Sequence, residues 1–153
     1  MINKLEIIKA IAAHDEWKHE LAKAIKDGWR GITPDQIERD NECGFGKWLY
    51  GLSLADKGSE HFNKVQSLHA AFHIYAARVL RLASCGETAA AEKSLGVGEL
   101  YAKTSDKLVA EMRDWIKAIE NKFALTRSDA PSLHFHPTSG FAYPRRVQPL
   151  AKP

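Results

Sequence analysis

Apolar residues recur every three or four positions along three long stretches of the chain, and this period predicts three amphipathic helices. The expected helices span residues 3–26, 59–84 and 99–123. The first buried stripe consists of Ile7, Ile11, His14, Leu21 and Ile25, the second of Phe62, Val65, His69, Phe72, Ala76, Val79 and Ala83, and the third of Tyr101, Leu108, Met112, Trp115, Ile119 and Phe123. No stretch alternates apolar and polar residues at period two, so the predicted fold class is all-α.

Shorter helices are expected between the long ones. The segment 33–36, Thr-Pro-Asp-Gln, has the residues of an N-cap, a proline in the first turn and a capping-box glutamine. A second short helix is expected from Phe45 to Tyr50, with Gly51 closing it, and a further helical region over residues 87–95. Together these elements predict an antiparallel, four-helix-bundle-like domain with short extra helices around Cys43.

Prolines divide the chain into two parts, because five of the six lie after residue 130 and proline interrupts helices. We therefore expect a helical domain over residues 1–125 and a mostly irregular, Pro-rich and basic tail over residues 126–153. The composition of the tail predicts flexibility. Its aromatic residues Phe135, Phe141 and Tyr143 would also suit a segment that docks on a surface.

The charge balance limits the classes of partner. The chain carries 22 basic and 19 acidic residues, and the excess lies in the tail, at Arg145, Arg146 and Lys152. The helical part offers no excess positive charge to a phosphate backbone, so we expect no nucleic-acid binding. No apolar run reaches the roughly 20 residues that span a bilayer, which predicts no membrane insertion and a cytoplasmic location. Two cysteines are too few for a disulfide framework.

Three histidines lie on the predicted apolar faces. His69 and His73 stand at i and i+4, a spacing that lets two imidazoles on one helix face share a metal ion, and His14 lies within the first stripe. A single histidine in such a stripe is usually a core residue with satisfied ring nitrogens, but three together favour a metal site. The residues between His69 and His73 include no glutamate that could activate a water molecule, so we expect no hydrolytic enzyme. The stripes are also almost free of carboxylates, which disfavours a di-iron bundle.

Cys43 is the fourth candidate ligand. It precedes Gly44-Phe45-Gly46-Lys47-Trp48, where the glycines are expected to allow a tight turn into a short helix and the two aromatic residues to fasten it to the bundle. A cysteine at a helix N-terminus is biased toward the thiolate, the form that binds metal. The alternative is a small buried hydrophobe. Three imidazoles and one thiolate form a complete tetrahedral set for zinc, with no open position for a substrate.

The three blocks of candidate ligands resemble the bacterial chemoreceptor zinc-binding (CZB) domain family. The blocks are residues 14–17 (His-Asp-Glu-Trp), 43–48 (Cys-Gly-Phe-Gly-Lys-Trp) and 69–73 (His-Ala-Ala-Phe-His), and 28 and 25 residues separate the ligands between them. The resemblance covers about residues 5–122. It implies a helical bundle that holds one zinc ion through His14, Cys43, His69 and His73. The chain shows no methyl-accepting coiled coil, cyclase domain or transmembrane segment, so we expect a stand-alone member.

The resemblance also implies a function. We expect a zinc-binding sensory or regulatory module of bacterial signalling, in chemotaxis or cyclic-di-GMP control, that responds to zinc availability, to oxidants such as hypochlorous acid through a zinc-bound thiolate, or to both. The alternative is an interaction or scaffold protein with a purely structural zinc ion. The expected partners are a second copy of the chain and a chemoreceptor or diguanylate cyclase. Trp29, Leu52 and Leu54 are apolar residues in predicted turns that would suit a dimer interface.

Overall fold

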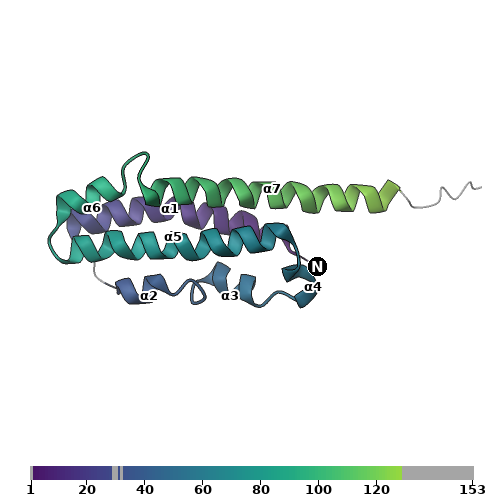
Figure 1. Cartoon of the computed structure of the whole chain (residues 1–153), viewed down its shortest axis with the longest axis horizontal. Helices are drawn as coiled ribbons and strands as arrows, with labels where there is room; N and C mark the ends of the chain where they lie inside the picture. Colours follow the sequence, from purple (N-terminus) through teal and green to yellow (C-terminus); the bar gives the residue numbers. More distant parts are fainter. Residues whose placement is uncertain (1, 29–30, 32, 129–153) are drawn as a thin grey trace, which may run out of the picture.

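The computed structural model describes residues 2–28, 31 and 33–128, which are mostly helical (Figure 1). No strand occurs among these residues, which confirms the predicted all-α class. The helices are α1 (Lys4–Asp27), α2 (Pro34–Glu38), α3 (Gly44–Tyr50), α4 (Leu54–Lys57), α5 (Glu60–Ser84), α6 (Thr88–Ser94) and α7 (Leu100–Ser128). None of these helices is long and apolar enough to cross a membrane.

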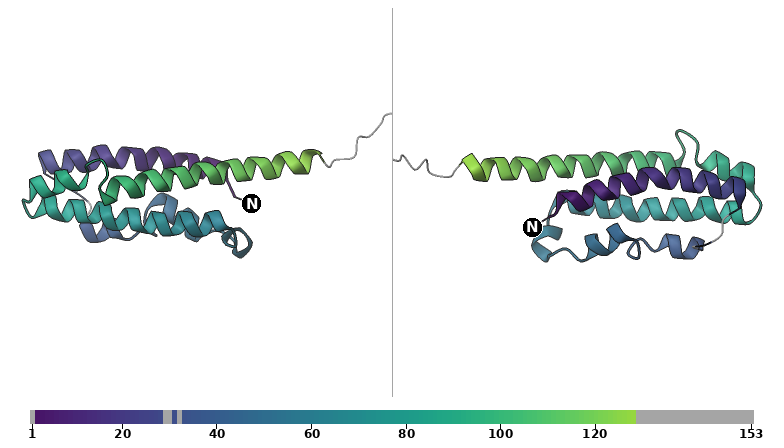
Figure 2. Two further views of the ribbon diagram at one scale, coloured as in Figure 1. Left: turned by 45° about the horizontal axis from the view of Figure 1, so that its top comes forward. Right: turned by 180° about the vertical axis from the view of Figure 1, so that it is seen from behind.

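The helices lie in four rows, and the chain changes direction from each row to the next (Figures 1 and 2). Helices α1 and α5 each form one row, α6 and α7 together form another, and the short helices α2, α3 and α4 follow one another in the fourth. Helix α5 is central, because it contacts α1, α2, α4, α6 and α7. The predicted antiparallel bundle is therefore confirmed, with the difference that its fourth row consists of three short helices.

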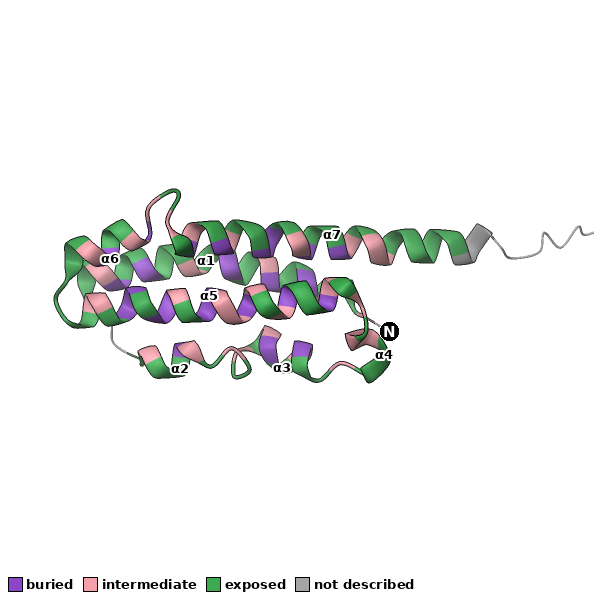
Figure 3. Ribbon diagram, viewed as in Figure 1, coloured by how far each residue is buried: buried purple, intermediate pink, exposed green. Residues whose placement is uncertain are grey.

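The buried residues lie mainly on the predicted stripes (Figure 3). Helix α5 buries its apolar face along almost its whole length, and His69 and His73 lie within that face. One predicted core residue is wrongly placed, since Phe123 is 44% exposed. Helix α7 extends beyond the end of the other rows (Figure 1), and Phe123 lines a surface pocket together with Ile2 and Lys4 instead of facing the core. The apolar period of α7 thus continues beyond the part of the helix that packs on the core.

Capping groups fix where the helices begin. The side chain of Asn3 accepts a hydrogen bond from the backbone N–H of Leu5 at the start of α1, and Thr33 and Gln36 form the predicted capping box of α2. The four-residue helix α4, which the sequence pattern did not predict, begins at a Ser53 cap. Helix α7 continues to Ser128, three residues into the stretch expected to be irregular. The rest of that tail, 129–153, lies outside the described residues.

Candidate metal centre

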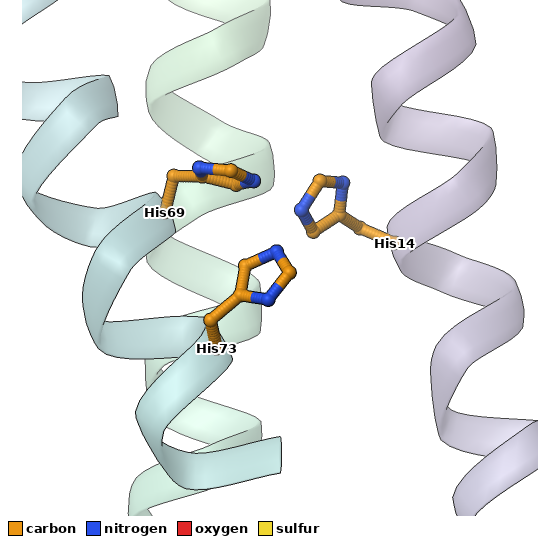
Figure 4. Close-up of side chains that lie close together, drawn as sticks. All are labelled: His14, His69 and His73. Atoms are coloured by element: carbon orange, nitrogen blue, oxygen red, sulfur yellow. The ribbon is translucent and has the colours of Figure 1, made fainter. Parts of the chain in front are cut away.

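Three histidines from two long helices converge in the interior of the bundle (Figure 4). His14 comes from α1, and His69 and His73 come from successive turns of α5. One ligand atom from each lies within 4.8 Å of the others, and all three side chains are buried. The i, i+4 spacing brings the ring centroids of His69 and His73 to 4.6 Å. The helical period therefore brings the three predicted histidines close enough together to share one metal ion.

Backbone carbonyls orient two of the three rings. The Nδ1–H of His14 donates to the carbonyl of Ala10, one turn earlier in α1, at 2.6 Å. The Nδ1–H of His73 donates to the carbonyl of Ile37 in α2. Since a carbonyl only accepts, each contact assigns the proton to Nδ1 and leaves Nε2 with a lone pair for a metal ion. Metal-binding histidines in proteins are typically held in this way.

Cys43 lies beside this cluster at the N-cap of α3. Its Sγ is 3.4 Å from Nε2 of His69, and it accepts a hydrogen bond from the backbone N–H of Gly46 at 3.1 Å. The close cluster itself comprises the three histidines, and Cys43 contacts this cluster at His69. The fold thus brings together four residues from three separate segments of the sequence, with His69 as their common neighbour.

Gly44 and Gly46 were expected to allow a tight turn through their conformational freedom, and the structure gives them different roles. Neither has a positive φ, so the turn does not need their conformational freedom. Gly46 is required for space, because a Cβ there would lie 1.8 Å from the carbonyl oxygen of Asp40. Gly44 faces open space. The close packing of the Asp40 turn on α3 is therefore what places the Cys43 sulfur.

Burial governs the protonation states at the site. It lowers the pKa of His14 to about 4 and that of His69 to about 2, and it also lowers the pKa of His73. All three imidazoles are therefore neutral at pH 7, the form that binds metal. Burial raises the pKa of the Cys43 thiol, against the opposing effect of backbone N–H groups of Gly46 and Phe45. The expected bias toward a thiolate is thus wrong for the metal-free protein, and metal binding must displace the thiol proton.

The donor set fits zinc better than other common metals. Three neutral imidazole nitrogens and one sulfur are the ligand types that zinc prefers, and they complete a tetrahedral set. Among the described residues, the buried polar side chains are these three histidines and Thr104. A di-iron or magnesium site would need several carboxylates facing the same point. These residues would therefore hold zinc in a site whose four positions are all filled by protein.

Aromatic residues hold the short helix against the site, as predicted. The ring of Phe45 packs edge-on to His69, with a centroid distance of 5.1 Å, and stacks on Trp48 at 5.4 Å. Trp48 in turn lies 6.2 Å from the buried ring of Trp115 in α7. A displacement of α3 would therefore change the packing of α7.

Cys43 is the most exposed of the four candidate ligands. Cys43 is partly exposed, whereas the histidines are buried. Two surface pockets, of about 380 Å³ and about 200 Å³, are both bordered by Cys43, Trp17 and His73. Cys43 therefore lies beside hollows at the surface of the bundle.

Comparison with known proteins agrees with this geometry. Residues 14–80 match the family model described as the chemoreceptor zinc-binding domain. This segment belongs to the CZB family. The four candidate ligands all lie within it, and the match begins at His14. No curated protein and no solved structure matches the chain.

The CZB site contains one residue that the sequence analysis missed. The carboxylate of Asp40 lies 3.6 Å from Nδ1 of His69, on the opposite side of the ring from Cys43. Asp40 lies in the turn between α2 and α3, three residues before Cys43. No periodic pattern covers that turn, so only its position close to Cys43 could have drawn attention to it.

Proposed function

We propose that this CZB domain is a zinc-dependent regulatory module in which Cys43 is the ligand that is released. The observation that carries this proposal is the difference between the four ligands. The histidines belong to two long helices and are buried, whereas Cys43 is partly exposed and caps a seven-residue helix. A short helix has little stability of its own, so its position depends on the contacts that hold it.

Zinc, when bound, supplies a cross-link between α1, α3 and α5. The protein's own residues prepare this cross-link: the carbonyls of Ala10 and Ile37 orient His14 and His73, and the N–H of Gly46 holds the sulfur. Loss of the Cys43 bond would leave α3 attached through Phe45 and Trp48. The expected output is therefore a change in the position of α3 on the bundle surface.

Two stimuli would release Cys43. The first is low zinc availability. The second is an oxidant such as hypochlorous acid, which would convert the thiolate and HOCl into a sulfenic acid and chloride, so that sulfur loses two electrons and chlorine gains them. A sulfenic acid is a weaker zinc ligand than a thiolate. The pockets beside Cys43 support direct access for a molecule of this size.

The decisive experiment compares Cys43 with the second cysteine. Cys85 is free and exposed, so Cys85→Ala is a matched control. Purified wild type and Cys85→Ala should contain about one zinc per chain by elemental analysis, and stoichiometric HOCl should release it. Cys43→Ala should hold less zinc, and HOCl should release none in addition. Equal zinc in all three proteins would remove Cys43 from the site.

The same samples separate a sensor from a scaffold with structural zinc. A regulatory site should exchange its zinc with a chelator in the folded protein, and HOCl should change the proteolysis pattern around α3. Zinc that leaves only when the protein unfolds would indicate a scaffold. Zinc that exchanges with a chelator but withstands HOCl would restrict the stimulus to zinc availability.

We propose a second copy of the chain as one partner, with a chemoreceptor or diguanylate cyclase in chemotaxis or cyclic-di-GMP control as the recipient of the signal. Exposed apolar residues support an interface: Leu5 and Ile8 in α1 are 51% and 47% exposed, and Leu54 is 88% exposed. Leu52 instead packs against the core, and Trp29 lies outside the described residues. Light scattering of wild type and of a Leu5→Glu, Ile8→Glu variant tests the dimer, which the double substitution should dissociate.

A further inference from the structure

His69 differs from the other two histidines in what faces its Nδ1 atom. That nitrogen is buried and has no hydrogen-bond partner among the described residues. His14 and His73 both donate from Nδ1 to backbone carbonyls. The acceptor near His69 is the carboxylate of Asp40, with Oδ2 at 3.6 Å, slightly beyond hydrogen-bond distance. A fully buried imidazole nitrogen without a partner is costly, so this contact calls for an explanation.

Asp40 is held in place from α3. The Tyr50 hydroxyl donates to Oδ2 of Asp40, the same oxygen that faces His69, at 2.8 Å. The Cys43 thiol is 3.5 Å from the backbone carbonyl of Asp40, and Gly46 packs against that carbonyl. Helix α3 therefore carries a ligand at its N-cap and, in its last turn, the hydroxyl that orients the carboxylate. One aspartate contacts both His69 and Cys43.

Charge explains why a carboxylate suits this position. Two positive charges on zinc and one negative charge on a thiolate leave one positive charge in a largely buried site, because the three imidazoles are neutral. An isolated buried charge is unfavourable, and the negative charge of Asp40 offsets it. A carboxylate that accepts the Nδ1–H also fixes the tautomer of an imidazole and makes its Nε2 more basic.

We propose that Asp40 is a positioning residue for the metal site and acts through His69. In this arrangement, the Tyr50 hydroxyl holds the Asp40 carboxylate, and the carboxylate accepts the Nδ1–H of His69 so that Nε2 faces the metal. The inference rests on the zinc site of the proposed function, but it does not depend on release of Cys43 or on any response to oxidants.

Asp40→Asn tests this proposal in the 153-residue chain, because it keeps the size of the side chain and removes its charge. We expect the zinc dissociation constant, measured by competition with a chromophoric chelator, to rise about 10- to 100-fold. Tyr50→Phe should raise the dissociation constant less. It should have little further effect in the Asp40→Asn background, because both residues act through the same contact with His69. Asp114→Asn is the control, since that aspartate pairs with Lys117 at the surface of α7.

A second measurement separates positioning from a general structural role. In the zinc-loaded protein, a long-range ¹H–¹⁵N spectrum should show His69 protonated at Nδ1, and Asp40→Asn should shift that proton resonance upfield. The melting temperature in EDTA should change little. Wild-type zinc affinity in Asp40→Asn, or an equal loss in Asp114→Asn, would overturn the proposal. An unchanged His69 resonance would also overturn it. Failure of the wild type to bind zinc would instead refute the metal site itself.

Discussion

Gly46→Ala tests how the short helix α3 is seated on the bundle. The added Cβ would lie 1.8 Å from the carbonyl oxygen of Asp40, 2.8 Å from its carbonyl carbon and 3.1 Å from Cα of Asn41. The obstacle is backbone, so either α3 or the turn must move by about 1.2 Å to restore a 3.0 Å contact. Overpacking of this kind typically costs about 1–3 kcal/mol, and we expect a loss of unfolding free energy near the upper end of that range.

The same shift should weaken zinc binding. The Gly46 N–H donates to Cys43 Sγ, so displacement of α3 moves the sulfur relative to His69. We expect the zinc dissociation constant to rise at least about tenfold, which corresponds to about 1.4 kcal/mol. Chelator competition measures the affinity, and urea unfolding in EDTA measures the stability. Gly44→Ala is the matched control, because its Cβ meets no atom within 4 Å. Wild-type affinity and stability in Gly46→Ala would refute this account of α3.

Three further predictions test the surroundings of the site. Phe72→Ala removes a fully buried ring that packs on His14 and should lower the unfolding free energy by about 3–5 kcal/mol in urea titrations; a loss below about 1 kcal/mol would contradict the observed packing. Arg81→Ala removes exposed ion pairs with Asp35 and Glu38, so it should change the stability little and leave the zinc content unchanged. Zinc loss in this variant would give the two ion pairs a role in holding α2. Removal of zinc by EDTA should lower the melting temperature, since free zinc at 100 times its dissociation constant stabilises the folded state by about 2.7 kcal/mol; equal melting temperatures with and without EDTA would show that zinc does not stabilise the fold.

The cluster of three histidines could be predicted because their positions repeat with the helical period. His14 and His69 occupy apolar stripes, and His73 follows His69 by one turn, so a pattern of residue types was enough to place them on the inner faces of α1 and α5. Cys43 could be predicted as the start of a short helix from the glycines and aromatic residues that follow it. Phe123 shows the limit of this reasoning, because the period alone does not reveal where the opposing layer ends.

The groups that orient the ligands could not be predicted in the same way. Two of them are backbone carbonyls, of Ala10 and Ile37, and every residue type has a carbonyl. The third, Asp40, lies in a turn whose path depends on the tertiary contact with Gly46. The sequence pattern therefore identifies residues that could bind a metal, whereas the structure is needed to show which nitrogen of each ring is available.

The structure also indicates where a response to zinc loss would be concentrated. His14 is tied to its own helix through the Ala10 carbonyl, and His73 to α2 through Ile37, so neither contact requires a metal ion. The Cys43 segment has weaker local support, because α3 is only seven residues long and its cap sulfur is itself a candidate metal ligand. Loss of the sulfur bond would therefore remove a metal ligand and would also leave the N-terminus of α3 free to shift. A rearrangement confined to α3 and its turn would be carried outward through Trp48 to α7, while α1 and α5 keep their packing.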